Sequence, residues 1–254
     1  MKKILFILTI LPLFFSCDGV GEDDRYIEVA PIKSERKVLL EEFTGQRCTN
    51  CPAAHAIIEK LEEQYGEDLV VVSIHAGSFG IAAPDGLMQP EGDIYSEKWG
   101  IKAFPCGIVD RSSGILTDSE WATAIRNDIE KTTSVALEIE ASVSSSGSSI
   151  DISTKMSSSS AVTANLQLWI TEDGIVGFQI DEGKRLQDYV HNNVFRAAVN
   201  GTWGQPVELS ANVFSNIESK IDIDDSWNID NLNVVGFIYN DSGVIQVAKC
   251  KIKK

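Results

Sequence analysis

Cysteine, positive charge and long apolar runs are all scarce in this chain of 254 residues. Its five cysteines are too few for a small fold held together by disulfides. With 22 Lys and Arg residues against 37 Asp and Glu residues, the formal net charge is −15. That balance argues against a nucleic-acid partner and against electrostatic docking on anionic lipid, because both need a basic surface. Beyond the N-terminal segment, no stretch approaches the ~20 apolar residues that span a bilayer.

The chain does have the composition of a globular protein, with 43% hydrophobic and 23% charged residues. Residues 1–16 have the layout of a secretory signal peptide, because a short basic region precedes an apolar run. The small residue before Cys17 resembles a bacterial lipobox, which implies acylation of Cys17; an ordinary signal peptide with a chance cysteine is the alternative. We expect a flexible tether over residues 17–35. Its acidic run at residues 22–24 is similar to the surface-export signal of Bacteroidota-type lipoproteins.

A pair of cysteines lies where a predicted strand gives way to a predicted helix. Val38–Leu40 opens a buried-strand pattern, a loop follows, and apolar residues recur at helical spacing just after Cys51. The N-terminus of a helix stabilises a thiolate, and Arg47 adds a positive charge next to Cys48. We expect Arg47 also to contact the substrate of these cysteines. Two intervening residues place both sulfurs on one helical turn, within disulfide reach. We therefore predict that an exposed Cys48 is the nucleophile and that a shielded Cys51 resolves the mixed disulfide.

A second segment resembles thioredoxin, in which a cis-proline precedes a core strand. Here Trp99–Pro105 leads into the apolar run Cys106–Val109. With the cysteine pair, the resemblance covers about residues 36–133 and implies an α/β thioredoxin-like domain. It further implies that Pro105 is cis and orients the substrate, and that Phe104 binds the substrate through its backbone.

Thioredoxin-like folds also keep a carboxylate six positions before the first cysteine. That position is Glu42, and the resemblance implies that this buried acid accepts the proton from Cys51. Two departures argue against a general reductase. The motif reads Arg-Cys-Thr-Asn-Cys, and a Gly/Pro-rich insertion occupies Ala76–Lys98.

Two other readings concern the thiols and a histidine. Cys106 is either a third redox thiol or, as we favour, a small buried hydrophobe. Cys48, Cys51 and His55 have a spacing with which a thiolate pair and an imidazole could hold copper or zinc. This metal site is an alternative to the redox reading, and otherwise we expect no cofactor beyond a redox-active Cys48–Cys51 disulfide.

The second half has a different texture, with short alternating runs separated by Ser, Gly, Asn and Asp. It predicts an all-β antiparallel (Ig-like) sandwich domain over residues 134–254. The expected strands are 135–143, 150–156, 161–171, 207–214, 232–239 and 244–252. Cys250 falls in the last of them and is expected to be structural. Residues 188–196, which include the isolated His191, form either a loop stapled by its own side chains or a binding surface.

A thioredoxin-like half followed by a sandwich with a Tyr-Val-His-Asn segment at residues 189–192 resembles the outer-membrane-protein-twenty-eight lipoprotein family over nearly the full chain. The resemblance implies an outer-membrane lipoprotein of a Gram-negative bacterium. It does not define an activity, because the molecular role of that family is poorly defined.

The leading hypothesis is a lipid-anchored thiol–disulfide oxidoreductase of the cell envelope, with protein thiols or disulfides as substrates. The alternative is a surface adhesion or binding lipoprotein, in which Cys48–Cys51 is a fixed structural disulfide and a surface protein is the partner. Both hypotheses expect membrane attachment through the N-terminal lipid and no nucleic acid.

Overall fold

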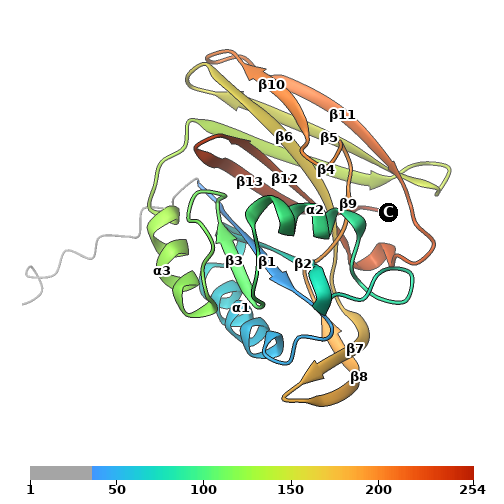
Figure 1. Cartoon of the computed structure of the whole chain (residues 1–254). Helices are drawn as coiled ribbons and strands as arrows, with labels where there is room; N and C mark the ends of the chain where they lie inside the picture. Colours follow the sequence, from blue (N-terminus) through green and yellow to red (C-terminus); the bar gives the residue numbers. More distant parts are fainter. Residues whose placement is uncertain (1–35) are drawn as a thin grey trace, which may run out of the picture. The chain divides into compact units, whose positions relative to one another are not determined.

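Strands dominate residues 36–254, the part of the chain that this computed structural model describes (Figure 1). The predicted signal peptide, Cys17 and the tether lie outside the described residues. The helices are α1 (Cys51–Tyr65), α2 (Pro90–Trp99) and α3 (Asp118–Ile129), and the short 3-10 helices are η2 (Gly66–Asp68), η3 (Gly77–Phe79) and η4 (Ile229–Asn231). The strands are β1 (Val38–Thr44), β2 (Leu69–His75), β3 (Cys106–Val109), β4 (Val135–Val143), β5 (Ser149–Ser158), β6 (Val162–Glu172), β7 (Ile175–Asp181), β8 (Lys184–His191), β9 (Val194–Ala198), β10 (Gln205–Leu209), β11 (Ser215–Asp222), β12 (Leu232–Asn240) and β13 (Gly243–Lys251).

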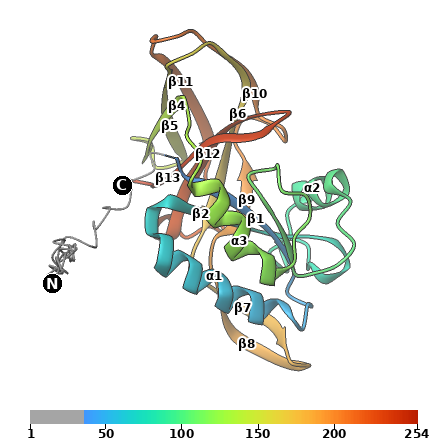
Figure 2. The ribbon, with the colours of Figure 1, turned by 90° about the vertical axis from the view of Figure 1, so that its left-hand side faces the viewer.

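One large mixed sheet runs through the described chain in the order β13-β12-β6-β9-β2-β1-β3, and β10 also pairs with β6. Strands β1 and β2 are parallel and are buried along their whole length, as the apolar run in each requires. Helices α1 and α3 contribute Ile58, Trp121 and Ile125 to a core against β1–β3. Helix α2 contributes Tyr95 to a different cluster, and Figure 2 shows it across the sheet from α1 and α3.

Two smaller sheets complete the fold. The three-stranded sheet β11-β5-β4 shares an apolar core with β6, β12 and β13. Strands β7 and β8 form a separate two-stranded hairpin, which Figure 1 shows below the large sheet, next to α1. Its turn is Glu182-Gly183, where both residues have positive φ angles of 47° and 78°.

The predicted fold class is wrong. We expected an α/β thioredoxin-like domain followed by a separate all-β antiparallel (Ig-like) sandwich, but strands from both halves belong to one mixed sheet. Strand β9 makes the connection, because it pairs with β6 on one side and with β2 on the other. Ser73 of β2 donates its backbone N–H to the carbonyl of Asn193 at 2.8 Å. The physical reason for the error is that β9 has five residues, too few to show an alternation of their own.

Many individual elements nevertheless agree with their sequence predictions. The strands around residues 38–40, 106–109 and 135–143 form as expected, and the helix begins at Cys51. The sequence Thr117-Asp118-Ser119-Glu120 is typical of a capping box before a helix, and Thr117 and Glu120 do form that box at the start of α3. Within residues 36–254, no helix has both the length and the apolar character needed to cross a membrane.

Candidate functional site: a covered disulfide

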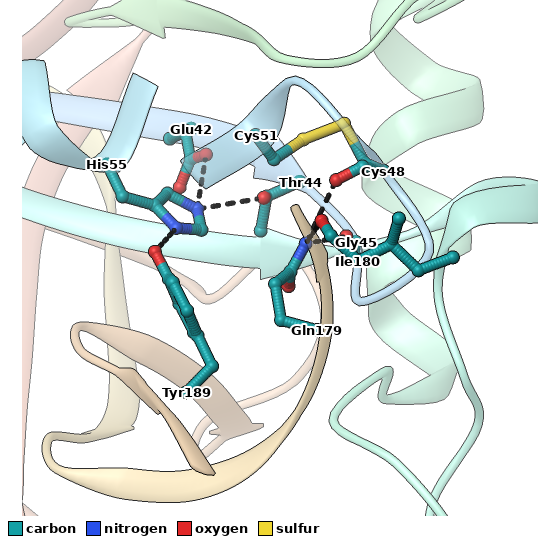
Figure 3. Close-up of a disulfide and its surroundings, with 9 residues drawn as sticks. All are labelled: Glu42, Thr44, Gly45, Cys48, Cys51, His55, Gln179, Ile180 and Tyr189. Carbon is teal, nitrogen blue, oxygen red and sulfur yellow. Dashed lines mark hydrogen bonds and ion pairs between the residues drawn. A yellow bond between two sulfur atoms is a disulfide. The ribbon is translucent and has the colours of Figure 1, made fainter. Parts of the chain in front are cut away.

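Cys48 and Cys51 form a disulfide at the point where the loop after β1 enters α1 (Figure 3). Their Cα atoms are 5.5 Å apart, which confirms that the two-residue spacing brings the sulfurs within bonding reach. The first turn of α1 contains no acidic residue, so nothing there opposes the positive end of the helix dipole. Arg47 is exposed, and its guanidinium group contacts the Gly80 carbonyl at 3.5 Å.

Both cysteines are buried, which contradicts the prediction of an exposed Cys48. Cys48 is 2% exposed and Cys51 is fully buried. The β7–β8 hairpin covers the loop that carries Cys48. The Gln179 amide donates to the Cys48 carbonyl at 2.9 Å (Figure 3). The Ile180 backbone N–H donates to the Gln46 carbonyl at 2.8 Å. The sequence prediction failed because these covering residues lie more than a hundred positions further along the chain.

The tip of the same hairpin is tied to the residue between the cysteines. Gly183 donates its backbone N–H to the Thr49 hydroxyl at 2.8 Å, and Glu182 donates to the Thr49 carbonyl at 3.4 Å. Near the base, the Gln46 side chain donates to the Phe178 carbonyl at 3.1 Å. Hydrogen bonds therefore hold the β7–β8 hairpin against residues 46–49 along its length, and the same bonds fix the geometry of that loop.

Glu42 lies on β1 next to the start of α1, and its carboxyl group is fully buried. One oxygen is 3.2 Å from His55 Nε2, while the other has no hydrogen-bond partner within the described residues. His55 stands one turn after Cys51 on the same helix, so both side chains face β1. Figure 3 shows the Glu42 carboxyl group pointing toward the His55 ring. Both groups lie on the Cys51 side of the disulfide.

His55 has two further partners. Its Nε2 atom is 3.0 Å from the Thr44 hydroxyl, and its Nδ1 atom is 2.7 Å from the Tyr189 hydroxyl at the end of the hairpin. Burial alone would lower the pKa of His55, but the charge of Glu42 and its hydrogen bond outweigh burial and raise it. Burial raises the pKa of Tyr189 to about 12, and the charge of Glu42 acts in the same direction.

The three histidines of the chain meet at one small cavity. His55, His75 and His191 line it together with Tyr189, and its volume is about 30 Å³. The His75 and His191 rings lie edge to face with their centroids 5.5 Å apart. Burial, with the charges of His191 and His55, lowers the pKa of His75, and burial with the charge of His55 lowers that of His191 to about 4. Both rings are therefore neutral at neutral pH, and His191 does not stand apart as the sequence indicated.

The alternative metal site is not assembled. Among residues 36–254, no group of three or more histidine, cysteine, aspartate and glutamate side chains is arranged to hold a metal ion. Cys48 and Cys51 are bonded to each other, and His55 faces Glu42 rather than the sulfurs.

A groove runs beside the disulfide. It has a volume of about 680 Å³, and its lining includes Thr49, Pro52 and Pro105. The Phe104–Pro105 bond is cis, as the resemblance implied. The Phe104 ring packs on Phe79, with ring centroids 5.5 Å apart. The groove contains three acidic residues, Asp118, Asp181 and Glu182, and no basic residue.

Cys106 and Cys250 are free thiols. Cys106 is 4% exposed and belongs to a core cluster, as the favoured reading expected. Burial and the charge of Glu42 raise its pKa to about 12, so it is protonated at neutral pH. Burial raises the pKa of Cys250, which lies on β13, to about 11.

Sequence reasoning missed Gln179 and Tyr189 as parts of this site. Segment 188–196 is not a loop stapled by its own side chains, because it forms the end of β8 and most of β9, and Val190 within it is exposed. The available signal was the Glu182-Gly183 turn between two runs of strand-forming residues, which is typical of a tight hairpin.

Fold and site together define a β-rich protein in which one mixed sheet carries a buried disulfide at the N-terminus of a helix. The chain belongs to the family described as Outer membrane protein Omp28, which matches residues 92–254. This membership confirms the predicted family and the predicted outer-membrane location. The matched region includes the hairpin but begins after α1, so it leaves out Cys48, Cys51, Glu42 and His55.

Two solved structures share the fold across both halves of the chain. HBP35 of Porphyromonas gingivalis has a TM-score of 0.64 at 15% identity, over 86% of this chain and 76% of that chain. Protein AGR_C_4864 from Agrobacterium tumefaciens has a TM-score of 0.53 at 15% identity, over 84% of this chain and 93% of that one. A domain of the outer membrane lipoprotein Omp28 from Porphyromonas gingivalis has a TM-score of 0.35 at 18% identity, over 48% of this chain and 91% of its own. A search of curated proteins found no match.

Proposed function

We propose that this protein is a thiol–disulfide oxidoreductase of the cell envelope, in which Cys48 and Cys51 exchange electrons with protein thiols or disulfides. The observation that carries the proposal is Glu42: a fully buried carboxyl group next to the disulfide, with one oxygen unpartnered among the described residues. A carboxylate in such a place is costly, and a disulfide with a purely structural role gives no reason for it. Exchange of a proton between Glu42 and Cys51 does give a reason for a buried carboxyl group at this position.

The exchange balances as follows. A substrate thiolate attacks Cys48 Sγ, the Cys48–Cys51 bond breaks, and Cys51 leaves as a thiolate that receives a proton from solvent by way of Glu42. A second substrate thiolate then attacks the substrate sulfur of the mixed disulfide and releases the Cys48 thiolate. The substrate loses two electrons, the cysteine pair gains them, and a disulfide-bearing redox partner oxidises the pair again. The reverse sequence, driven by a dithiol partner, reduces a substrate disulfide.

Access requires the β7–β8 hairpin to move, because Cys48 is 2% exposed. Once the hairpin is displaced, an extended substrate segment would lie in the groove between Pro52 and Pro105, beside Cys48. Phe104 would bind this segment through its backbone, Pro105 would orient it, and exposed Arg47 would contact it near the nucleophile. The same proposal includes attachment by a lipid on Cys17 and display at the cell surface, which the acidic run at residues 22–24 indicates.

The test is turnover of a fluorescent peptide disulfide by the mature chain with dithiothreitol as electron donor. We expect turnover, its loss in Cys48→Ser, and its retention in Cys106→Ser, a matched change at a buried thiol outside the pair. Absence of turnover in the unaltered protein, or equal turnover in Cys48→Ser, would contradict the proposal.

The second candidate is a surface-binding lipoprotein with a fixed disulfide, and the burial of Cys48 favours it. In that case the hydrogen bonds from Gln179 and Gly183 would hold a rigid loop, and the hairpin would present its exposed Val176 and Val190 to a partner. This candidate predicts no turnover, whereas Cys48→Ser would lower stability.

A further inference from the structure

The disulfide needs a route for a proton. Cys51 is fully buried, and the hairpin covers the loop on the Cys48 side. Each exchange cycle nevertheless adds one proton to the Cys51 thiolate or removes one from the thiol. Glu42 can hold that proton, but Glu42 is itself fully buried and must exchange it in turn.

His55 is placed to continue the route. One ring nitrogen, Nε2, lies 3.2 Å from the Glu42 carboxylate, and the other, Nδ1, lies 2.7 Å from the Tyr189 hydroxyl. An imidazole can accept a proton on one nitrogen while it releases another from the opposite nitrogen. The Thr44 hydroxyl, 3.0 Å from Nε2, fixes the tilt of the ring toward Glu42.

The route ends at the small cavity beyond His55. Its volume of about 30 Å³ has room for water, and it is lined by polar side chains that can bind a water molecule. His55 and Tyr189 both line this cavity, and the Tyr189 hydroxyl contacts His55 Nδ1 there. The lining also includes exposed Glu59 and Asn192, which open it to solvent. The five links from Cys51 to bulk water are therefore Glu42, His55, Tyr189, the cavity and its exposed rim.

The charged groups around His55 favour this single path. From α1, Glu59 and Glu62 face the cavity; from β2 and β8, His75 and His191 do so. Asp181 of β7 acts electrostatically on Tyr189, and Cys106 of β3 lies within the electrostatic reach of Glu42. The pKa values of His75 and His191 are lowered, whereas the charge of Glu42 raises that of His55, so His55 is the histidine of this cluster that takes up a proton most readily.

We propose that Glu42, His55 and Tyr189 form a proton relay between Cys51 and the cavity, with Tyr189 supplied by the hairpin that covers the disulfide. The relay rests on the proposed exchange function. Its residues divide by role: Glu42 exchanges a proton with the reacting sulfur, while His55 and Tyr189 act through Glu42 as positioning residues. The contacts that cover Cys48 come from Gln179 and Gly183 toward the tip of the hairpin, whereas Tyr189 lies near its base, opposite Gly177. The tip can therefore move away from Cys48 while Tyr189 stays beside His55.

The experiment measures the rate at which dithiothreitol reduces the disulfide of the full mature chain between pH 5 and pH 9. Each rate is divided by the concentration of dithiothreitol thiolate, so that the titration of dithiothreitol itself does not affect the pH profile. The variants are His55→Gln and Tyr189→Phe, and Tyr239→Phe is the matched control, because Tyr239 also donates a buried hydroxyl, to the Trp203 carbonyl. We expect the unaltered protein to show an inflection from the relay. His55→Gln should remove it and slow reduction about 100-fold at neutral pH. Tyr189→Phe should shift the inflection, and Tyr239→Phe should leave it in place.

The outcomes separate the two proposals. Normal reduction and turnover with an unchanged pH profile in both His55→Gln and Tyr189→Phe would overturn the relay and leave the exchange function standing. No reduction of the unaltered protein at any pH would overturn the exchange function itself. If His55→Gln fails to fold, the milder Tyr189→Phe variant decides the question alone.

Discussion

At the scale of single residues, a buried ion pair illustrates how the large sheet tolerates charge. Arg111 donates two hydrogen bonds, of 3.0 and 2.9 Å, to the carboxylate of Glu41 on β1. Its guanidinium group also lies 4.5 Å from the Tyr239 ring centroid and 4.6 Å from that of Phe237. Both side chains are buried and lie beside aromatic rings, so each charge depends on its partner for compensation.

We expect Arg111→Met to lower the free energy of unfolding by about 3–5 kcal/mol, because it leaves the Glu41 charge buried without a partner. Urea denaturation measures the change. Arg126→Ala is the control, because Arg126 forms an exposed pair with Glu130 at 3.6 Å and should cost no more than about 0.5 kcal/mol. Equal losses in the two variants would contradict this account of Arg111.

His191 makes stability depend on pH. Its folded pKa of about 4 lies below the ~6.5 of an unfolded histidine, so the unfolded chain binds more protons between these values. Stability should therefore fall as pH drops from about 6.5 to about 4, by up to about 3 kcal/mol from this residue. In His191→Gln the fall should be smaller. Burial raises the pKa of Asp110 to about 6, so Asp110 changes stability with pH in the opposite direction. Both proteins contain Asp110, so its contribution cancels when the two pH-dependent losses of stability are compared. Parallel urea titrations at pH 7 and pH 4.5 test this, and identical losses in the two proteins would refute it.

At the scale of elements, the β7–β8 hairpin controls access to the disulfide. Replacing residues 178–188 by Asn-Gly would join Gly177 and Tyr189, which already face each other across the hairpin. The shortened hairpin keeps Tyr189 and loses the hydrogen bonds to Gln46, Cys48 and Thr49. Since each such bond contributes about 1 kcal/mol, dithiothreitol should reduce the disulfide at least about tenfold faster.

The control for the hairpin is the β4–β5 turn around Gly147, which is exposed and remote in sequence from the cysteines. Shortening that turn should leave the reduction rate unchanged. If the shortened β7–β8 hairpin gave the same rate as the unaltered protein, the hairpin would not limit access.

How far the sequence predicted these elements depends on how local their signals are. The disulfide and the start of α1 follow from spacing within a few residues, and the capping box at Thr117 identifies α3. The position of Glu42 followed from a resemblance. The cover over Cys48 could not be predicted, because Gln179 of β7 and Gly183 of the hairpin turn contact the loop from more than a hundred residues further along the chain. A hydrophobic pattern identifies a strand but not its neighbours.

At the scale of the molecule, the large sheet joins the two halves of the described chain. Besides the β2–β9 pairing, Arg36 just before β1 donates to the Val244 and Ile245 carbonyls of β13 and to Asp110. The two halves of the sequence, which differ in their hydrophobic pattern, therefore share one sheet, and we expect them not to fold independently. The pattern changes near residue 134 because the next strands, β4 and β5, pair antiparallel in the separate three-stranded sheet, whereas β1 and β2 pair in parallel within the large sheet.

Residues 36–254 should accordingly unfold in one transition. Cys106 on β3 and Cys250 on β13 are free thiols, one from each half, and they serve as natural probes. Pulsed thiol labelling across a urea series should give the same midpoint at both cysteines. Two separate midpoints would show that the halves unfold independently.

The central claim is that Cys48–Cys51 is a working redox couple beneath a movable cover. The most direct measurement is its reduction potential in the mature chain, equilibrated in glutathione buffers from both the oxidised and the reduced side and read by alkylation and mass spectrometry. The account predicts a reversible couple with a potential above about −270 mV, in the range of proteins that catalyse exchange. A pair that stays oxidised throughout, with a potential below about −300 mV, would be a structural disulfide and would contradict the claim.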